Sequence, residues 1–197
     1  QAQTASLNTS DIILEPVGRN TAAAIAVAAW SIFKKDPKGI MLVLASDHAI
    51  TDQSVFNNKV DLGLARAQLG AMVTFGIEPS YPETGYGYIR SENKEEVSKV
   101  SEFVEKPNLE VAQNYCEDGR YLWNSGMFMF RVDSFLEELR MYCPEIQTLS
   151  EQAVVNAESD LDFLRLEKSS FEKIQSISID YAVMEKTKSA EVIRFPN

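Results

Sequence analysis

The sequence contains little of what several classes of protein require. Its 197 residues include two cysteines, Cys116 and Cys143, and one histidine, His48. The cysteines have no CxxC partner, which argues against a disulfide framework or a metal knuckle. No apolar run approaches the roughly 20 residues that span a bilayer. We therefore expect a soluble protein whose composition suits the cytoplasm.

Positive charge is also scarce. The chain has 19 lysines and arginines against 29 aspartates and glutamates, a formal net charge of -10, and its cations are scattered. Such a chain repels a nucleic-acid backbone and an anionic membrane surface, so we expect neither among its partners. Hydrophobic residues make up 45% of the chain. This content is enough for one sizeable core, and we expect a single domain over residues 1–197.

The first half of the chain alternates helical and strand patterns. An alanine-rich helix is expected at 22–35, and a continuous apolar run at 40–45 is typical of a strand buried on both faces. Helical spacing returns at 55–69, before a second buried strand at 71–76. Strand, helix and strand in this order predict a right-handed parallel crossover.

The second half has a different pattern. Two glycines lie among aromatics at 83–90, apolar and polar residues alternate at 97–105, and a long strand is expected at 121–132. Residues 145–170 are acidic and helix-favouring, with no glycine or proline. Asp180 is the expected cap of a last short helix.

Asp47 is the first candidate for chemistry. It follows the strand at 40–45, and the carboxyl ends of parallel strands line the ligand crevice of open α/β sheets, where a carboxylate can hold Mg²⁺. An aspartate here can equally cap the next turn. The neighbouring His48 has no second histidine or cysteine nearby, so we assign it no catalytic or metal role.

A glycine-containing turn with the sequence EPVGRNT, at 15–21, precedes the alanine-rich helix. Asn20 or Thr21 can cap that helix, and Arg19 adds a cation beside the free backbone N–H groups, so an anion could bind there. One glycine is a weak signal. An ordinary strand-to-helix turn with a solvated arginine is the alternative.

Two further segments suit a phosphorylated sugar. Glu105 and Lys106 pair an acceptor for hydroxyls with a cation for a phosphate, and residues 123–127 set small polar groups beside an aromatic. Taken alone, each segment has a plainer explanation. The first can be a surface ion pair, and the second a glycine that lets another backbone approach.

Six motifs in order resemble those of mannose-1-phosphate guanylyltransferases, especially the bacterial type often fused to a mannose-6-phosphate isomerase domain. They are EPVGRNTAAAIA, LASDHAI, ETGYGYI, FVEKPN, WNSGMFMFR and SIDYAVMEK. The resemblance implies an α/β fold with a Rossmann-like mixed, mainly parallel sheet flanked by helices. It also implies the formation of GDP-mannose and pyrophosphate from GTP and mannose 1-phosphate, with Mg²⁺ as cofactor.

The resemblance assigns roles motif by motif. It makes Asp47 and Lys106 catalytic, with Asp47 one of two carboxylates that hold Mg²⁺. The residues it implies for nucleotide binding are Glu15, Gly18, Arg19, Asn20 and Thr21. Those it implies for binding the sugar phosphate are Tyr86, Gly87, Glu105, Lys106, Asn124 and Gly126.

The implied reaction needs no general base, because the attacking oxygen of mannose 1-phosphate is already an anion. Two parts of the family pattern are missing: the glycine-rich loop before the nucleotide motif, and the Asp-Val-Gly motif with the second metal carboxylate. We therefore expect a domain truncated at both ends, with negligible transferase activity by itself and with sheet edges through which copies can associate as a homo-oligomer. Two alternatives stay open: a related enzyme with another sugar or nucleotide, and a non-catalytic module that binds sugar nucleotides.

Overall fold

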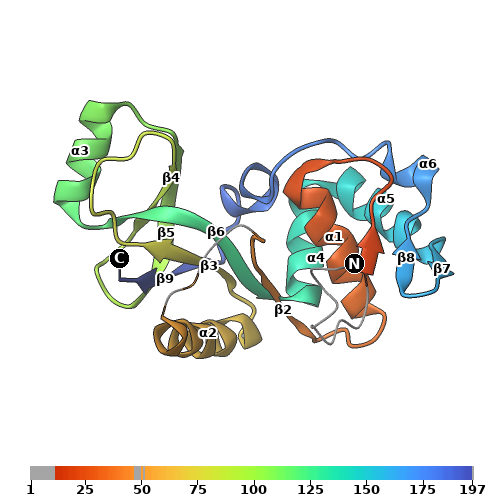
Figure 1. The fold of residues 1–197 in the computed structure, drawn as a ribbon. Coiled ribbons are helices and arrows are strands. Elements are labelled where there is room, and N and C mark those ends of the chain that lie inside the picture. Colours follow the sequence, from red (N-terminus) through yellow and green to blue (C-terminus); the bar gives the residue numbers. More distant parts are fainter. Residues whose placement is uncertain (1–11, 47–49, 51, 197) are drawn as a thin grey trace.

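Two halves lie side by side in the computed structural model, which describes residues 12–46, 50 and 52–196. One half is built on a large sheet and the other on a group of helices (Figure 1). Within the described part of the chain, every helix is too short or too polar to cross a membrane.

The large sheet has six described strands in the order β2–β6–β3–β9–β5–β4. These are β2 (Ile40–Val43), β3 (Met72–Ile77), β4 (Gly87–Ser91), β5 (Val97–Glu105), β6 (Tyr121–Arg131) and β9 (Ala190–Phe195), with helices α2 (Gln53–Gln68) and α3 (Leu109–Asp118) in the same half. The predicted mixed sheet flanked by helices is confirmed. Among the described strands of this sheet, however, only β3 and β9 pair in parallel, so the sheet is mainly antiparallel rather than mainly parallel.

The long strand β6 accounts for this difference. β2 and β3 run in the same direction, as the predicted strand–helix–strand crossover requires, but β6 lies between them and runs the opposite way. Its apolar residues alternate between two cores: Phe128 and Phe130 pack on one face of the sheet, and Met127 and Met129 on the other. A strand that is apolar on both faces is stable only in the interior of a sheet.

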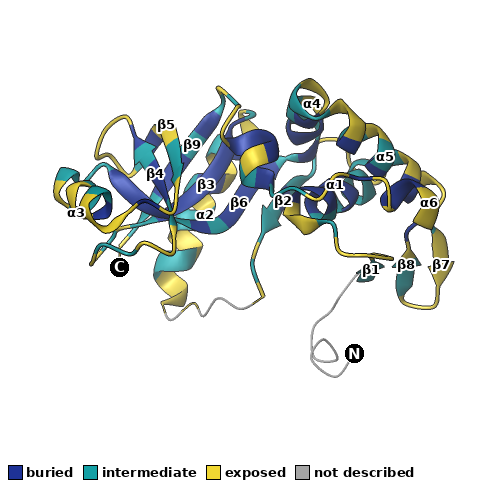
Figure 2. Cartoon of the chain, turned by 90° about the horizontal axis from the view of Figure 1, so that it is seen from above, coloured by how far each residue is buried: buried dark blue, intermediate teal, exposed yellow. Residues whose placement is uncertain are grey.

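The helical half contains α1 (Asn20–Phe33), α4 (Val132–Tyr142), α5 (Pro144–Val155) and α6 (Lys168–Phe171). Buried alanines of α1 share one core with apolar residues of α4, α5 and one face of the large sheet. α2 packs on the other face. Figure 2 shows the resulting pattern, with buried residues concentrated in β6 and β3 and on the inner sides of the helices.

A small sheet replaces part of the helix that the composition favours at 145–170. After α5 the chain forms the hairpin of β7 (Glu158–Asp160) and β8 (Phe163–Arg165), and β8 pairs in parallel with β1 (Ile12–Leu14). Backbone hydrogen bonds to a strand from the start of the chain therefore override the local helix preference.

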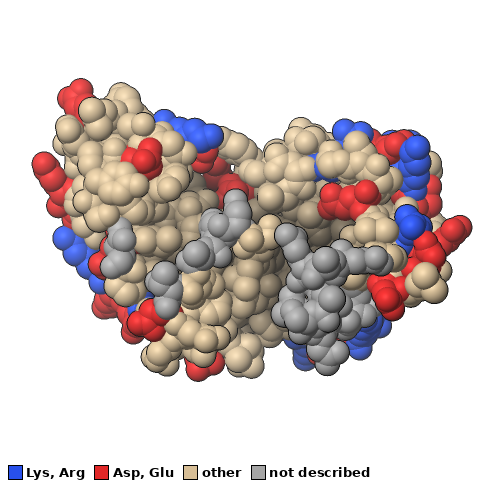
Figure 3. All heavy atoms as spheres, viewed as in Figure 1, with Lys and Arg blue, Asp and Glu red and all other residues tan. Residues whose placement is uncertain are grey.

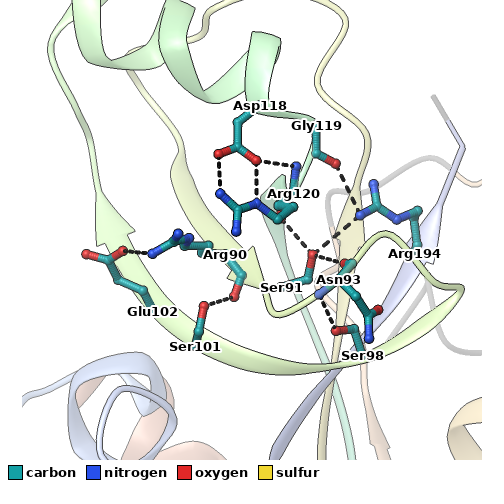
Figure 4. Close-up of polar contacts among 10 residues, drawn as sticks. All are labelled: Arg90, Ser91, Asn93, Ser98, Ser101, Glu102, Asp118, Gly119, Arg120 and Arg194. Atoms are coloured by element: carbon teal, nitrogen blue, oxygen red, sulfur yellow. Dashed lines mark hydrogen bonds and ion pairs between the residues drawn. The ribbon is translucent and has the colours of Figure 1, made fainter.

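A polar network attaches α3 to the outer end of the large sheet (Figure 4). Arg194 donates to the Oγ of Ser91 and to the carbonyl oxygen of Gly119, which follows α3. Arg120 donates two hydrogen bonds to Asp118, and these bonds lower the pKa of that carboxyl to about 2. Both arginines thus have protein partners, so the network serves to attach α3 to the sheet.

Candidate functional site

The site is built on an irregularity in β6. Thr74 of β3 pairs with Phe128, but Gly76 pairs with Asn124, so β6 carries extra residues between these two pairs. Gly126 adopts a φ of +68° there, a conformation that favours glycine. The bulge therefore comes directly after Asn124, which itself still pairs with Gly76, and bulges are common next to functional sites.

Hydrogen bonds inside the bulge hold its shape. The Oδ1 of Asn124 accepts the N–H of Gly126 at 3.1 Å, and the Oγ of Ser125 donates to the carbonyl oxygen of Phe75 at 2.5 Å. A Cβ placed on Gly126 would meet nothing within 4 Å. The described atoms therefore leave open space beside Gly126, the residue whose N–H is bonded to the Asn124 amide.

Asp180 meets this bulge from a distant part of the chain. It is the first residue of the short π-helix η1 (Asp180–Met184), the blue coil between the two halves in Figure 1. Its Oδ1 accepts a hydrogen bond of 2.8 Å from the Nδ2 of Asn124. Burial raises the pKa of the Asp180 carboxyl, and the negative charge of Glu105 raises it further, whereas the bond from Asn124 opposes the shift.

Gly87 and Glu105 form the second wall of the site. The two residues pair across β4 and β5, and a Cβ on Gly87 would lie 2.7 Å from the Oε2 of Glu105 and 3.7 Å from the Cβ of Asn124. The carboxylate of Glu105 therefore fills the space that a side chain at position 87 would need. Glycine at this position brings Glu105 close to Asn124.

Lys106 supplies the positive charge beside these groups. Its Nζ lies 3.4 Å from the Oε1 of Glu105, and its side chain is 64% exposed, so the ammonium is free to meet a ligand. Its backbone has a φ of +46°, which is unusual for a residue with a side chain. Strain of this kind is concentrated at functional sites, where the surrounding structure maintains it.

Aromatic side chains border the site on the β4 side. The ring of Trp123, next to Asn124, has Tyr81 at 4.9 Å and Tyr86 at 5.5 Å between ring centroids, both edge-on. Trp123 is buried, while Tyr86 is exposed. Tyr86, one of the residues predicted to bind the sugar phosphate, therefore has an exposed ring.

The predicted nucleotide segment lies at the start of α1 and is docked on the chain just before η1. The Oγ1 of Thr21 accepts the N–H of Ile179 at 2.9 Å, and the N–H of Ala22 donates to Ile177. The Nη2 of Arg19 donates to the backbone carbonyl of Glu172. The arginine is thus held by the protein rather than solvated.

Asn20 contributes to this turn in a different way from the expected cap. α1 begins at Asn20, whose φ is +64°, and its Oδ1 accepts the N–H of the next residue, Thr21, at 2.8 Å. Gly18 has open space around it, since a Cβ there would meet no described atom within 4 Å. Partial burial raises the pKa of Glu15, whose side chain still reaches solvent.

The structure brings the two predicted groups together through consecutive residues. Ile179 contacts Thr21 of the nucleotide segment, and Asp180 contacts Asn124 of the sugar-phosphate segment. Figure 3 shows the surface hollowed where the two halves of the molecule meet, with acidic side chains beside the hollow. Asp180 itself was absent from the predicted site, because its position before a short helix indicates an ordinary cap.

Asp47, the predicted metal ligand, lies outside the described residues, as does His48. Within residues 12–46, 50 and 52–196, no three His, Cys, Asp or Glu side chains gather in a way that could hold a metal ion. The Mg²⁺ site at Asp47 stays a prediction from the sequence.

Known proteins resemble this chain over most of its length. The family model described as nucleotidyl transferase matches residues 1–169. A mannose-1-phosphate guanylyltransferase of Salmonella montevideo is 49% identical over 98% of this chain, and one of Escherichia coli K12 is 48% identical over 94%. The xanthan biosynthesis protein XanB of Xanthomonas campestris pv. campestris is 48% identical over 98%. The chain spans 42%, 40% and 41% of the length of these three relatives, respectively.

Two solved structures share the fold. The crystal structure of a mannose-6-phosphate isomerase from Helicobacter pylori superposes with a TM-score of 0.85 at 32% identity, over 98% of this chain and 75% of that one. A mannose-1-phosphate geranyltransferase from Thermus thermophilus superposes with a TM-score of 0.80 at 32% identity, over 92% of this chain and 51% of that one.

Proposed function

Since the chain belongs to the nucleotidyl transferase family, we propose that the protein joins GTP and mannose 1-phosphate to give GDP-mannose and pyrophosphate. The relatives named mannose-1-phosphate guanylyltransferase support this choice within the family. Both substrates are small molecules, which suits a chain whose negative charge disfavours nucleic acid.

One observation carries the proposal: hydroxyl-binding groups and a cation converge beside open space. Glu105 and Asn124 offer hydrogen-bond acceptors and an amide donor, and Lys106 offers a positive charge within reach of Glu105. A hexose phosphate presents hydroxyls at one end and an anionic group at the other. Gly126 lets such a ligand approach the backbone, and Gly87 makes room for the carboxylate of Glu105.

The chemistry asks the protein mainly to align two anions. A phosphate oxygen of mannose 1-phosphate forms a bond to the α-phosphorus of GTP, and the bond from that phosphorus to the bridging oxygen breaks as pyrophosphate leaves. The nucleophile is already charged, so no side chain must remove a proton from it. In this scheme Lys106 holds the sugar phosphate in position and offsets part of its charge.

The nucleotide would bind at the start of α1. Arg19 is held there by the carbonyl of Glu172, and Asn20 and Thr21 border the same turn. Guanine presents N1–H and an exocyclic amine on one edge, and the carboxylate of Glu15 can accept both bonds. Thr21 already accepts the N–H of Ile179, so we assign it to supporting the turn as well as to contacting the nucleotide.

The proposal includes Mg²⁺, which the carboxylate of Asp47 would hold. When bound, the cation would neutralise phosphate charge and orient the pyrophosphate leaving group. The affinity for Mg²⁺ would depend on the carboxylate of Asp47, because Mg²⁺ prefers oxygen ligands of this kind. A cytoplasmic location and association of copies into a homo-oligomer stay predictions from the sequence.

The test is isothermal titration of the protein with GTP, UTP and GDP-mannose in the presence of Mg²⁺, with Asp47→Ala as the control for the metal. We expect GTP and GDP-mannose to bind more tightly than UTP, and Asp47→Ala to weaken GTP binding. Tighter binding of UTP would favour the related enzyme with another nucleotide. If the chain at its full natural length neither bound these ligands nor released pyrophosphate, the proposal would be wrong.

A further inference from the structure

The amide of Asn124 is held in one orientation by two partners of opposite kind. Its Oδ1 accepts the N–H of Gly126 at 3.1 Å, and its Nδ2 donates to Asp180 at 2.8 Å. A backbone N–H can only donate and an ionised carboxylate can only accept. The two contacts together therefore exclude the flipped amide, and one amide hydrogen and one oxygen lone pair stay available to a ligand.

Stability alone gives a poor account of an aspartate at position 180. The carboxyl is substantially desolvated, and the charges of Glu105 and Asp180 oppose each other. Burying a charge beside a like charge costs free energy, and the bonds to Asn124, to the side chain of Ser178 and to the residue's own backbone offset this cost only in part. The expected capping role is not observed either, since η1 begins at Asp180 itself.

The position of Asp180 is also anchored from the other half of the molecule. The preceding residue, Ile179, is buried and donates its N–H to the Oγ1 of Thr21 at 2.9 Å. Ile177 accepts the N–H of Ala22 at 3.2 Å. Two hydrogen bonds from the start of α1 thus set where the carboxylate meets Asn124.

We propose that Asp180 is a positioning residue for the sugar-phosphate subsite: it holds the Asn124 amide in the orientation that meets hydroxyls of a hexose 1-phosphate. This inference rests on the proposed function. Asp180 acts through Asn124 and touches no reacting atom. The hexose hydroxyls can each donate and accept, so an amide locked in one orientation selects those whose geometry matches it.

The experiment measures binding of mannose 1-phosphate and of GTP, separately, to the chain at its full natural length. The variants are Asp180→Ala, Asn124→Ala and the double variant, with Asp180→Asn as the conservative change and Glu185→Gln as the control. Glu185 directly follows η1; burial raises its pKa and the charges of Asp180 and Glu105 raise it further, but no hydrogen bond to Asn124 is found among the described residues. It therefore controls for the loss of one negative charge.

We expect Asp180→Ala to raise the Kd for mannose 1-phosphate about tenfold, which corresponds to roughly 1.4 kcal/mol. The Kd for GTP should stay within about twofold, and the double variant should bind no more weakly than Asn124→Ala, because the two residues act as one unit. Asp180→Asn retains an acceptor oxygen, so it should recover most of the affinity without lowering the melting temperature.

Three results would overturn the inference while leaving the proposed function intact. The first is an unchanged Kd for mannose 1-phosphate in Asp180→Ala. The second is additive losses in the double variant, which would mean that Asp180 acts independently of Asn124. The third is an equal loss in Glu185→Gln, which would assign the effect to charge. If the unmodified protein bound no mannose 1-phosphate, the proposed function and this inference would fail together.

Discussion

Replacing Gly87 by alanine should weaken sugar-phosphate binding while leaving the fold stable. The added Cβ would lie 2.7 Å from the Oε2 of Glu105, against an ordinary contact of 3.4 Å or more. The carboxylate must therefore retreat by about 0.7 Å, the difference between these distances. The displaced group is the end of a flexible side chain that is 43% exposed, so it can move without disturbing the core.

The two consequences differ in size. Alanine recovers the roughly 0.5–1 kcal/mol that glycine costs inside a strand, which offsets the local crowding, and we expect the free energy of unfolding to change by less than about 1 kcal/mol. Losing a hydrogen bond between a hydroxyl of the sugar and a charged carboxylate costs roughly 1.5–3 kcal/mol of binding free energy. We therefore expect the Kd for mannose 1-phosphate to rise between about tenfold and 100-fold.

Titration calorimetry and thermal unfolding on the same variants separate these effects. Gly85→Ala is the matched control, because Gly85 is exposed just before β4 and its Cβ would approach only the carboxylate of Glu83, with the Oε1 at 3.1 Å. A normal affinity of Gly87→Ala for the sugar phosphate would refute the view that binding needs the Glu105 carboxylate in its present position beside Gly87. A loss of more than about 2 kcal/mol in stability would instead show that Gly87 serves the fold.

Three further predictions address the core, acid stability and base selectivity. Gly76→Ala should lower the free energy of unfolding by about 1–3 kcal/mol, measured in urea, because its Cβ would lie 2.7 Å from the buried side chain of Leu122; an unchanged midpoint would contradict this reading. The pKa of Asp118 is about 2 in the folded state, because Arg120 donates hydrogen bonds to the charged carboxylate. The stability that this pair contributes is therefore fully present above the unfolded pKa of about 4 and is lost as pH falls through about 2. Asp118→Asn should therefore remove about 1 kcal/mol at neutral pH, given screening of a partly exposed pair, and should flatten the dependence of stability on pH between about 4 and 2; an unaltered slope would rule the pair out as its source. Glu15→Gln should reduce the preference for GTP over UTP at full natural length, and unchanged selectivity would exclude Glu15 as the guanine acceptor.

Local elements of the first half of the chain were predictable to within a few residues. The helix expected at 22–35 is α1 at Asn20–Phe33, and that expected at 55–69 is α2 at Gln53–Gln68. Their starts depend on nearby groups, such as the Asp52 side chain that accepts the N–H of Val55. Interactions of this range are visible in the sequence itself.

The strand order could not be predicted in the same way. β6 follows β4 and β5 in the chain but enters the sheet between β2 and β3, and it makes the sheet mainly antiparallel in its described part. The hairpin at β7 and β8 likewise forms within a segment that composition favours as helix, because β1 pairs with it. Such pairings depend on which distant strands present matching apolar faces.

The sequence by itself determined the family and the order of the six motifs. It also supplied the two groups of residues that are predicted to bind the nucleotide and the sugar phosphate. These are carried by residue types at short spacings, where local propensity and turn chemistry act. Only the tertiary structure decided that Asp180, 56 positions after Asn124, contacts its amide, and that Glu105 fills the space above Gly87. A carboxylate before a short helix has the same local pattern whether it caps that helix or meets a partner across the fold. The packing of η1 between the two halves selects the second role, because it brings the carboxylate within hydrogen-bonding distance of the bulge in β6.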